Sequence, residues 1–120
     1  MNVGEKYTLN ITISDKETAE AIGSGGLPVY ATPSMICHFE DAAYRFAAQY
    51  GHQTVGTKVD IAHLRACLPG TEVTITAELV EAEGRRLEFV VKAEDEKGLL
   101  GEGKHQRFII DPERFMSKLR

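Results

Sequence analysis

Three side chains in this sequence combine acid–base chemistry with unusual placement: Thr32, Glu40 and His63. Glu40 lies about 40° around a predicted helix from the apolar Ile36, and His63 ends the inward-facing row of a predicted strand. Burying an ionisable group costs free energy unless the group is paired, and functional sites often carry that cost. A lone inward histidine is more often a satisfied core residue. Two ionisable residues on a helix and a strand that face each other favour a site.

Thr32 stands at the start of that helix, where its hydroxyl can cap the first free backbone N–H groups. The same groups and the helix dipole suit an anion or a polarised carbonyl oxygen, although for Thr32 alone a simple N-cap is the better interpretation. Eight helical residues span about 12 Å, so Thr32 and Glu40 of one chain cannot touch the same atom. His63 or the substrate must bridge that gap, or two subunits must build the site together.

One long helix must position Thr32 and Glu40. Thr32-Pro33 is a strong helix start and Gly51 is a natural stop, which predicts a helix from Thr32 to about Tyr50. It follows a glycine-rich loop at residues 23–28. At about 100° per residue, one broad stripe of this helix is apolar, comprising Met35, Ile36, Phe39, Ala42, Ala43, Phe46, Ala47 and Tyr50.

The rest of the chain alternates with the period of a strand. One strand is predicted to carry Val55, Thr57, Val59, Ile61 and His63 on its inward face. Similar runs predict strands at 7–13, 73–79, 87–93 and 101–110, and Asp111-Pro112 begins a short terminal helix. Short turns require antiparallel neighbours, and only one helix is long enough to cover the sheet. We therefore expect one α+β domain over residues 1–120, with an antiparallel sheet of about five strands wrapped around one long central helix.

Composition excludes several classes of protein. With 120 residues, 42% hydrophobic and 27% charged, the chain can build a core, and its net charge of −4 argues against a nucleic-acid partner. No apolar run reaches the ~20 residues of a membrane span, and no signal peptide is visible, so we expect a cytoplasmic protein. Cys37 and Cys67 match no metal or disulfide motif, and we predict no metal site. His38, His52 and His105 are interpreted as surface or packing residues, and the open sheet edges predict a homodimer.

Several segments together resemble the fluoroacetyl-CoA thioesterase family of hotdog proteins. They are Ala31-Thr32-Pro33-Ser34-Met35 with Glu40, Val55-Gly56-Thr57 leading to His63, Leu68-Pro69-Gly70-Thr71-Glu72-Val73, Thr76-Ala77-Glu78-Leu79 and Gly84-Arg85-Arg86-Leu87-Glu88-Phe89. The resemblance covers roughly residues 27 to 110, and the joint order and spacing of the segments are more specific than any one of them. It implies a hotdog fold and a homodimer with the site close to the subunit interface.

The resemblance also implies an activity, the hydrolysis of a small acyl-CoA to free acid and CoA. Thr32, Glu40 and His63 match the family's catalytic residues, Gly56 matches a glycine beside the bound thioester, and Gly84 matches a hairpin glycine near the coenzyme A chain. No cofactor is implied, because coenzyme A is part of the substrate. The fluoroacetyl-specific enzyme has an aromatic-rich lid, whereas residues 25–30 here contain one aromatic. The resemblance therefore implies thioester hydrolysis in general rather than selectivity for a fluorinated acyl group.

Three roles remain open for these residues at this point. Thr32 and the helix N-terminus can hold the oxyanion while His63 activates water, with Glu40 orienting the imidazole. Glu40 can instead attack to form an anhydride, or Thr32 can attack after activation by His63. Candidates for the phosphates of coenzyme A are Lys58, Arg65, Arg85 and Arg86. The alternatives are a non-catalytic hotdog module that binds an acyl-CoA or another small ligand and, more remotely, a hydratase, for which Asp60 and His63 are too closely spaced.

Overall fold

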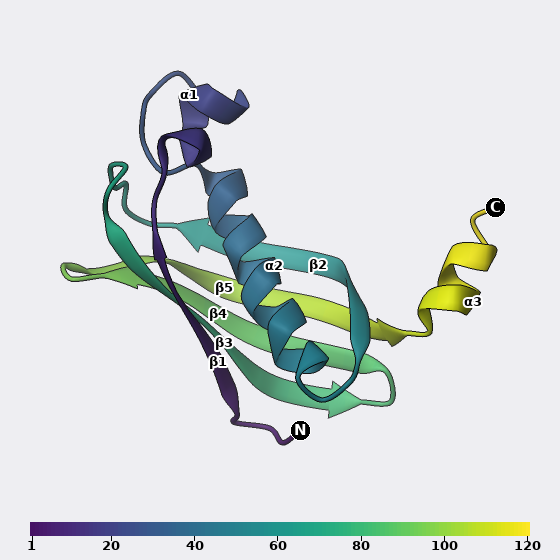
Figure 1. Ribbon diagram of the computed structural model, residues 1–120. Coiled ribbons are helices and arrows are strands. Elements are labelled where there is room, and N and C mark those ends of the chain that lie inside the picture. The colour runs from purple at the N-terminus through teal and green to yellow at the C-terminus, as the bar shows by residue number, and fades with distance from the viewer.

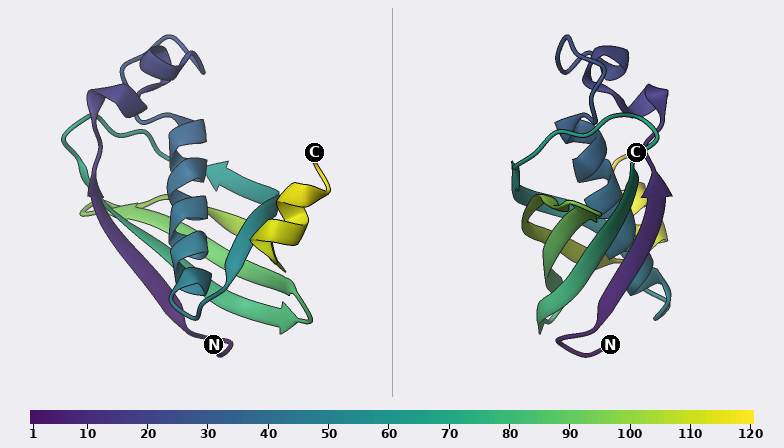
Figure 2. Two further views of the ribbon diagram at one scale, coloured as in Figure 1. Left: turned by 45° about the vertical axis from the view of Figure 1, so that its right-hand side comes forward. Right: turned by 90° about the vertical axis from the view of Figure 1, so that its left-hand side faces the viewer.

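The computed structural model describes all residues 1–120, and one long helix lies across a five-stranded sheet (Figure 1). The strands are β1 (Lys6–Thr12), β2 (Gln53–His63), β3 (Glu72–Glu83), β4 (Arg86–Asp95) and β5 (Gly98–Ile110). The helices are α1 (Ala19–Ile22), the long α2 (Thr32–Ala48) and α3 (Pro112–Ser117), with a 3₁₀ turn, η1 (Asp15–Glu17), before α1. Figure 2 shows the sheet bending around α2, with η1 and α1 at the N-terminal end of that helix.

Every pair of neighbouring strands is antiparallel, in the order β1-β3-β4-β5-β2. Tight turns at Gly84 and Gly98 join β3 to β4 and β4 to β5, and both residues have the positive φ that favours glycine. Because β2 pairs only with β5, and β1 only with β3, these two strands form the edges of the sheet. The arrangement confirms the predicted α+β architecture and its order of one strand, one long helix and four strands.

The core lies between α2 and the inner face of the sheet. The helix contributes six side chains that are at most 1% exposed, namely Met35, Phe39, Ala42, Ala43, Phe46 and Ala47. Fully burying a side chain such as Phe46 contributes about 2 kcal/mol, so this stripe holds α2 firmly on the sheet. Two residues of the predicted stripe lie outside the core: Ile36 is half-buried, and Tyr50 lies beyond the helix end and is exposed.

The start of α2 differs from the prediction by one residue. Ala31 is the N-cap, with extended backbone, and Thr32 is the first helical residue. An N-cap side chain reaches the free N–H groups only from a non-helical backbone conformation, and Thr32 is already helical. The interpretation of Thr32 as an N-cap is therefore wrong, and its hydroxyl contacts His63 instead.

β2 contains a β-bulge between Gly56 and Lys58, where Thr57 has no partner on β5. The extra residue reverses the alternation of the strand, because side chains along a strand alternate with a period of two. The inner face therefore carries Thr54, Gly56, Val59, Ile61 and His63. The predicted inward row is correct from Val59 to His63 and wrong for Val55 and Thr57, since the sequence contains no mark of the bulge.

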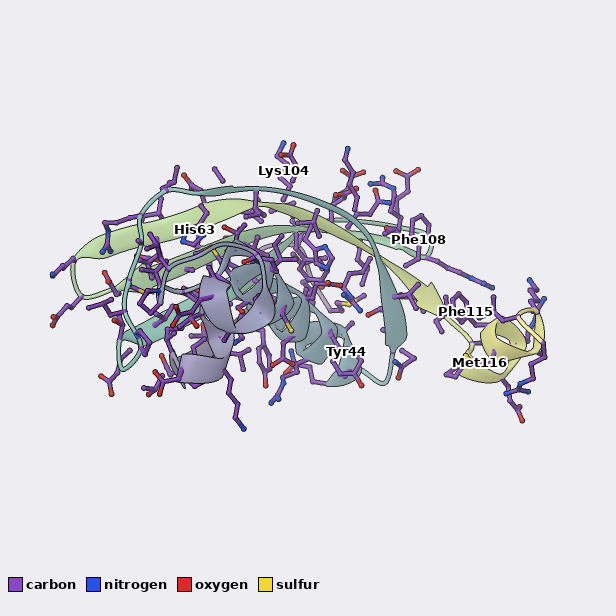
Figure 3. All side chains as sticks on the ribbon, turned by 90° about the horizontal axis from the view of Figure 1, so that it is seen from above. Tyr44, His63, Lys104, Phe108, Phe115 and Met116 are labelled. Carbon is purple, nitrogen blue, oxygen red and sulfur yellow. The ribbon has the colours of Figure 1, made fainter.

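The C-terminal helix α3 stands away from the body of the protein, at the opposite end of the molecule from His63 (Figure 3). Its N-cap is Asp111, whose Oδ1 accepts a hydrogen bond of 3.2 Å from the Arg114 N–H, as predicted for the Asp111-Pro112 start. Phe115 and Met116 on this helix are exposed. No helix in the protein has the length and apolar character required to cross a membrane.

Candidate active site

Thr32 and His63 form a direct hydrogen bond. The Thr32 Oγ1 and His63 Nδ1 atoms are 2.7 Å apart, although the two residues are 31 positions apart in the chain. Thr32 is the first residue of α2 and His63 is the last residue of β2, so the contact depends on α2 lying across the sheet in this register. A hydroxyl and an imidazole at this distance have the geometry of a nucleophile and its base.

The surroundings of His63 keep its imidazole neutral and leave one nitrogen free. Burial lowers the pKa of His63 below its ordinary value, and the nearby Arg65 backbone offsets this only in part. Nδ1 contacts Thr32, while Nε2 is buried and has no hydrogen-bond partner in the chain. Buried polar atoms are nearly always paired, so this unpaired nitrogen marks a place where a proton donor or acceptor is expected.

Glu40 belongs to a second cluster, two turns further along α2. Its Oε2 accepts a hydrogen bond of 3.2 Å from Nη1 of Arg107 on β5. The Glu40 side chain is 43% exposed, whereas that of Arg107 is only 7% exposed. Glu40 therefore lies at the edge of the core, as predicted, with its carboxylate neutralised by a buried guanidinium.

Arg107 is held by a network of its own. Its Nε donates to Thr54 Oγ1 at 2.8 Å, and its Nη2 donates to the Thr54 carbonyl at 3.1 Å. Nη1 also lies 3.1 Å from His105 Nε2, while His105 Nδ1 donates to the Lys58 carbonyl at 2.8 Å. Burial lowers the pKa of His105, and the nearby Arg107 charge lowers it further. His105 therefore stays neutral and accepts a hydrogen bond from Arg107.

Gly56 lies against this second cluster. It faces Arg107 across the β2–β5 pair, and a Cβ at this position would lie 2.5 Å from Glu40 Oε2. The same Cβ would lie 3.2 Å from Arg107 Nη1 and 3.2 Å from His105 Cε1. Only glycine leaves the carboxylate, the guanidinium and the imidazole in their places. Glycine at position 56 thus lets the Glu40 carboxylate keep its position, which is a reason for glycine that the sequence alone did not reveal.

Within one chain the two clusters are well separated. The Glu40 carboxylate lies beside Gly56, and seven residues of strand, roughly 20 Å, separate Gly56 from His63. In Figure 3, His63 and Phe108, the neighbour of Arg107, lie far apart. The structure therefore brings together Thr32 and His63, and separately Glu40 and Gly56, but it does not bring Glu40 to His63 in the same chain.

The other predicted binding residues lie outside both clusters. Gly84 is at the β3–β4 turn, where a Cβ would meet nothing within 4 Å, so it contacts neither cluster. Arg65 forms a hydrogen-bonded ion pair with Asp95, and Arg86 pairs with Glu81, Glu83 and Glu88. Of the four basic candidates, Lys58 and Arg85 have no carboxylate partner. Lys58 and Arg85 are therefore the two candidates whose positive charge is available to bind a phosphate.

Sequence reasoning missed the residues that complete the second cluster. Arg107 and His105 occupy alternate positions of β5 and so share its inner face, where apolar side chains are expected. That pair of polar residues in one inward row was a usable signal, of the same kind that identified His63. Thr54 had no such signal, because the β-bulge that turns it inward cannot be read from the sequence.

Comparisons with known proteins show the family to which the chain belongs. The model of a family described as fluoroacetyl-CoA-specific thioesterase matches residues 13–113. A fluoroacetyl-CoA thioesterase from Streptantibioticus cattleyicolor is 36% identical, over 100% of this chain and 93% of that protein. A solved fluoroacetyl-CoA thioesterase structure superposes with a TM-score of 0.92 at 36% identity, covering 100% of this chain and 96% of that one. A thioesterase superfamily member from Thermus thermophilus has a TM-score of 0.90 at 27% identity, covering 99% and 90%.

Proposed function

The chain belongs to the family of fluoroacetyl-CoA-specific thioesterases and is a thioester hydrolase, and we propose that it hydrolyses a small acyl-CoA at the Thr32–His63 pair. The observation that carries this proposal is the 2.7 Å contact between Thr32 Oγ1 and His63 Nδ1. An uncharged imidazole beside an accessible hydroxyl is ready to accept its proton. The alternative of a non-catalytic binding module is set aside, because binding requires no such pair and the family is one of hydrolases.

The contact favours the route in which Thr32 is the nucleophile. Thr32 Oγ1 bonds to the thioester carbon while His63 takes its proton, and the C–S bond then breaks as His63 returns the proton to the thiolate. Water, deprotonated by His63, then attacks the acyl carbon. The C–O bond to Thr32 breaks as His63 returns the proton to Thr32 Oγ1, and the free acid is released. Thr32 begins α2, so the free N–H groups of this helix terminus stabilise the negative charge on the carbonyl oxygen in both steps. No resident cofactor takes part.

This chemistry is tested by following thiol release from a panel of short, branched, aromatic and halogenated acyl-CoAs. We expect release from a small acyl-CoA, and an acyl adduct on Thr32 in acid-quenched samples analysed by mass spectrometry. Thr32→Ala removes the nucleophile and the adduct together. No release from any thioester contradicts the proposed function, whereas full activity of Thr32→Ala overturns the nucleophile route and leaves His63 acting on water.

We expect little selectivity for a fluorinated acyl group. Tyr30, the one aromatic in residues 25–30, is 1% exposed and is part of the core, and Leu27 in this loop is 65% exposed. No aromatic side chain of this segment is available to line an acyl pocket. We therefore expect kcat/KM for fluoroacetyl-CoA and acetyl-CoA to agree within about tenfold. A ratio of several thousand contradicts this expectation and places the selectivity elsewhere in the site.

The separation of Glu40 from His63 supports a site shared by two chains. β2 is an edge strand with one side of its backbone unpaired, and its apolar Val59 is 36% exposed. Antiparallel pairing of two β2 strands about a two-fold axis between Val59 and Asp60 places residue 63 of one chain opposite residue 56 of the other. The Glu40 carboxylate, which lies beside Gly56, then approaches the partner's His63. This homodimer has two identical sites.

A mixing experiment tests the shared site. Glu40→Gln and His63→Ala are each expected to be inactive as homodimers. Equal amounts of the two, exchanged at random, form hybrid dimers with one complete site and recover about a quarter of wild-type activity. No recovery contradicts the shared site, and a light-scattering mass of a single chain at micromolar concentration contradicts the dimer.

Two features support the remaining assignments. Lys58 lies on β2 and Arg85 follows the Gly84 turn, and both have charge available for the phosphates of coenzyme A. Gly84 then serves near the coenzyme A chain, as the family resemblance implies. The free thiols Cys37 and Cys67 support a cytoplasmic location, where cysteines stay reduced.

A further inference from the structure

Tyr30 is a buried tyrosine that lies between two histidines. Its side chain is 1% exposed, and its ring packs edge-to-face against the His63 imidazole, with the ring centroids 6.1 Å apart. On its other side the Tyr30 ring lies 5.6 Å from the ring of His38. Tyr30 immediately precedes the N-cap of α2 and is two residues before Thr32. It therefore contacts the base of the proposed site and is connected through the backbone to the nucleophile.

The Tyr30 hydroxyl is held by a chain of hydrogen bonds. Its oxygen lies 2.5 Å from His38 Nδ1, and His38 Nε2 lies 2.7 Å from Glu17 Oε2. Partial burial raises the pKa of Glu17, but the Ser14 backbone amide and His38 outweigh this and lower it overall, so Glu17 is ionised. The carboxylate accepts the Nε2–H of His38, and in this tautomer Nδ1 accepts the Tyr30 O–H.

The backbone ties the same residues together. Ala31 N–H donates to the Glu17 carbonyl at 3.0 Å, and Tyr30 N–H donates to the Cys67 carbonyl at 2.9 Å. Tyr30 is thus joined to η1 on one side and to the segment that follows His63 on the other. Because both its backbone and its hydroxyl are hydrogen-bonded, the Tyr30 ring is fixed in place where it packs against His63. His38 is therefore not a simple surface residue, although it lies on the polar side of α2.

We propose that Glu17, His38 and Tyr30 form a hydrogen-bonded relay that positions the His63 imidazole against Thr32. The expected effect of the relay on the rate rests on the proposed function. Its effect on the orientation of the His63 ring does not depend on that function. The three residues are positioning residues, because Thr32 Oγ1 is hydrogen-bonded to His63 and to none of them. A free Tyr30 ring lets His63 rotate away from Thr32, and small displacements of a catalytic group cost large factors in rate.

The kinetic test compares Tyr30→Phe, His38→Leu and the double variant. Tyr30→Phe and His38→Leu are each expected to lower kcat by about tenfold and to leave KM within about twofold, because the reacting geometry is affected rather than substrate binding. The double variant is expected to fall no further than either single variant, since the residues act as one unit. Additive losses, or an unchanged kcat, overturn the relay.

Tyr50→Phe is the matched control. The Tyr50 hydroxyl is hydrogen-bonded too, in its case directly to the Glu5 carboxylate, but Tyr50 is exposed and lies beyond the C-terminal end of α2. This variant loses the same atom and is expected to keep wild-type kcat. Thermal unfolding of all variants, with assays well below each transition, separates a loss of folded protein from a loss of geometry.

The ¹⁵N chemical shifts of the His63 ring provide a readout that needs no substrate. Wild type and Tyr50→Phe are expected to show one defined tautomer, and Tyr30→Phe and His38→Leu a shifted, averaged signal. Unchanged His63 shifts in both relay variants overturn the proposal. If wild-type protein hydrolyses no acyl-CoA, the proposed function fails, and the ring shifts alone decide whether the relay positions His63.

Discussion

Two histidines on neighbouring strands, His63 on β2 and His105 on β5, have lowered pKa values for the same main reason, burial. They differ in their partners. Both nitrogens of His105 are occupied, Nδ1 by the Lys58 carbonyl and Nε2 by Arg107, whereas His63 has a partner only at Nδ1. A histidine with both nitrogens satisfied supports structure, while one with a free nitrogen can pass a proton onward. The comparison separates the imidazole that we propose to be catalytic from the structural one.

The partners of the two histidines also differ in charge: that of His63 is neutral, whereas His105 lies beside an ion pair. Thr32 is a neutral hydroxyl beside a neutral imidazole, so a proton can move between them without breaking an ion pair. Glu40 and Arg107 form an ion pair that is already neutralised and braced by Thr54 and His105. The first cluster is suited to proton transfer, and the second is suited to holding the Glu40 carboxylate in a fixed position.

Removing each imidazole in a separate variant is expected to give the largest difference, with activity lost in one variant and stability in the other. His63→Ala is expected to lower kcat/KM by about 10³-fold with little change in stability, because the general base is lost and the unpaired Nε2 goes with it. His105→Asn is expected to lower stability with a smaller effect on the rate. Thiol release and urea unfolding of both variants measure this difference. If His63→Ala keeps wild-type activity, His63 has no part in the mechanism.

Arg107→Leu tests the structural side of the comparison. It leaves Glu40, Thr54 and His105 without their shared donor. Because Thr54 and His105 are buried whereas the Glu40 side chain is 43% exposed, the loss is expected to cost about 2 kcal/mol of unfolding free energy. Arg107→Lys keeps the positive charge but not the fork of donors, so it is expected to recover only part of the loss. Denaturant unfolding of the three proteins checks the order. Equal stability of wild type and Arg107→Leu contradicts the role of the network.

Two glycine variants show whether the second cluster acts on catalysis. Gly56→Ala forces the Glu40 carboxylate aside, because the added carbon lies 2.5 Å from Oε2, and kcat/KM is expected to fall about tenfold. Gly51→Ala meets no neighbour and is the control; its φ of +83° makes alanine cost about 1 kcal/mol of stability without loss of activity. Steady-state kinetics beside thermal melts distinguishes the two. Equal activity of the two variants would show that the position of Glu40 is unimportant.

The pH dependence of stability is expected to show the smallest effect. His63 and His105 both have a folded-state pKa below their unfolded value of about 6.5, so the unfolded chain binds more protons between these two values. Unfolding free energy is therefore highest above pH 6.5, falls as the pH drops from about 6.5 towards the folded-state pKa values, and levels off below them. Urea unfolding from pH 7.5 to 5 measures the slope, which is expected to be shallower in His63→Ala and in His105→Asn. A slope that both variants leave unchanged contradicts the assignment.

Much of the fold was predictable because it follows local rules. The start at Thr32-Pro33 and the stop near Gly51 define α2 within two residues, and the turns at Gly84 and Gly98 require antiparallel strands. His63 was recognisable because an ionisable residue ends an apolar row. The two elements before α2, η1 and α1, were not predicted, because they are only three and four residues long and have no periodicity to detect.

The sequence by itself determined which residues are available for chemistry, the order of the elements and the apolar stripe that binds α2 to the sheet, because these depend on residue type and short-range periodicity. Only the tertiary structure decided how the polar residues are grouped. It pairs Thr32 with His63, assigns Glu40 to Arg107 and places Tyr30 between two imidazoles. These groupings depend on one bulge in β2 and on the register of β5 against it. Such long-range contacts are fixed by packing and hydrogen bonding across the whole chain, and no local pattern contains them.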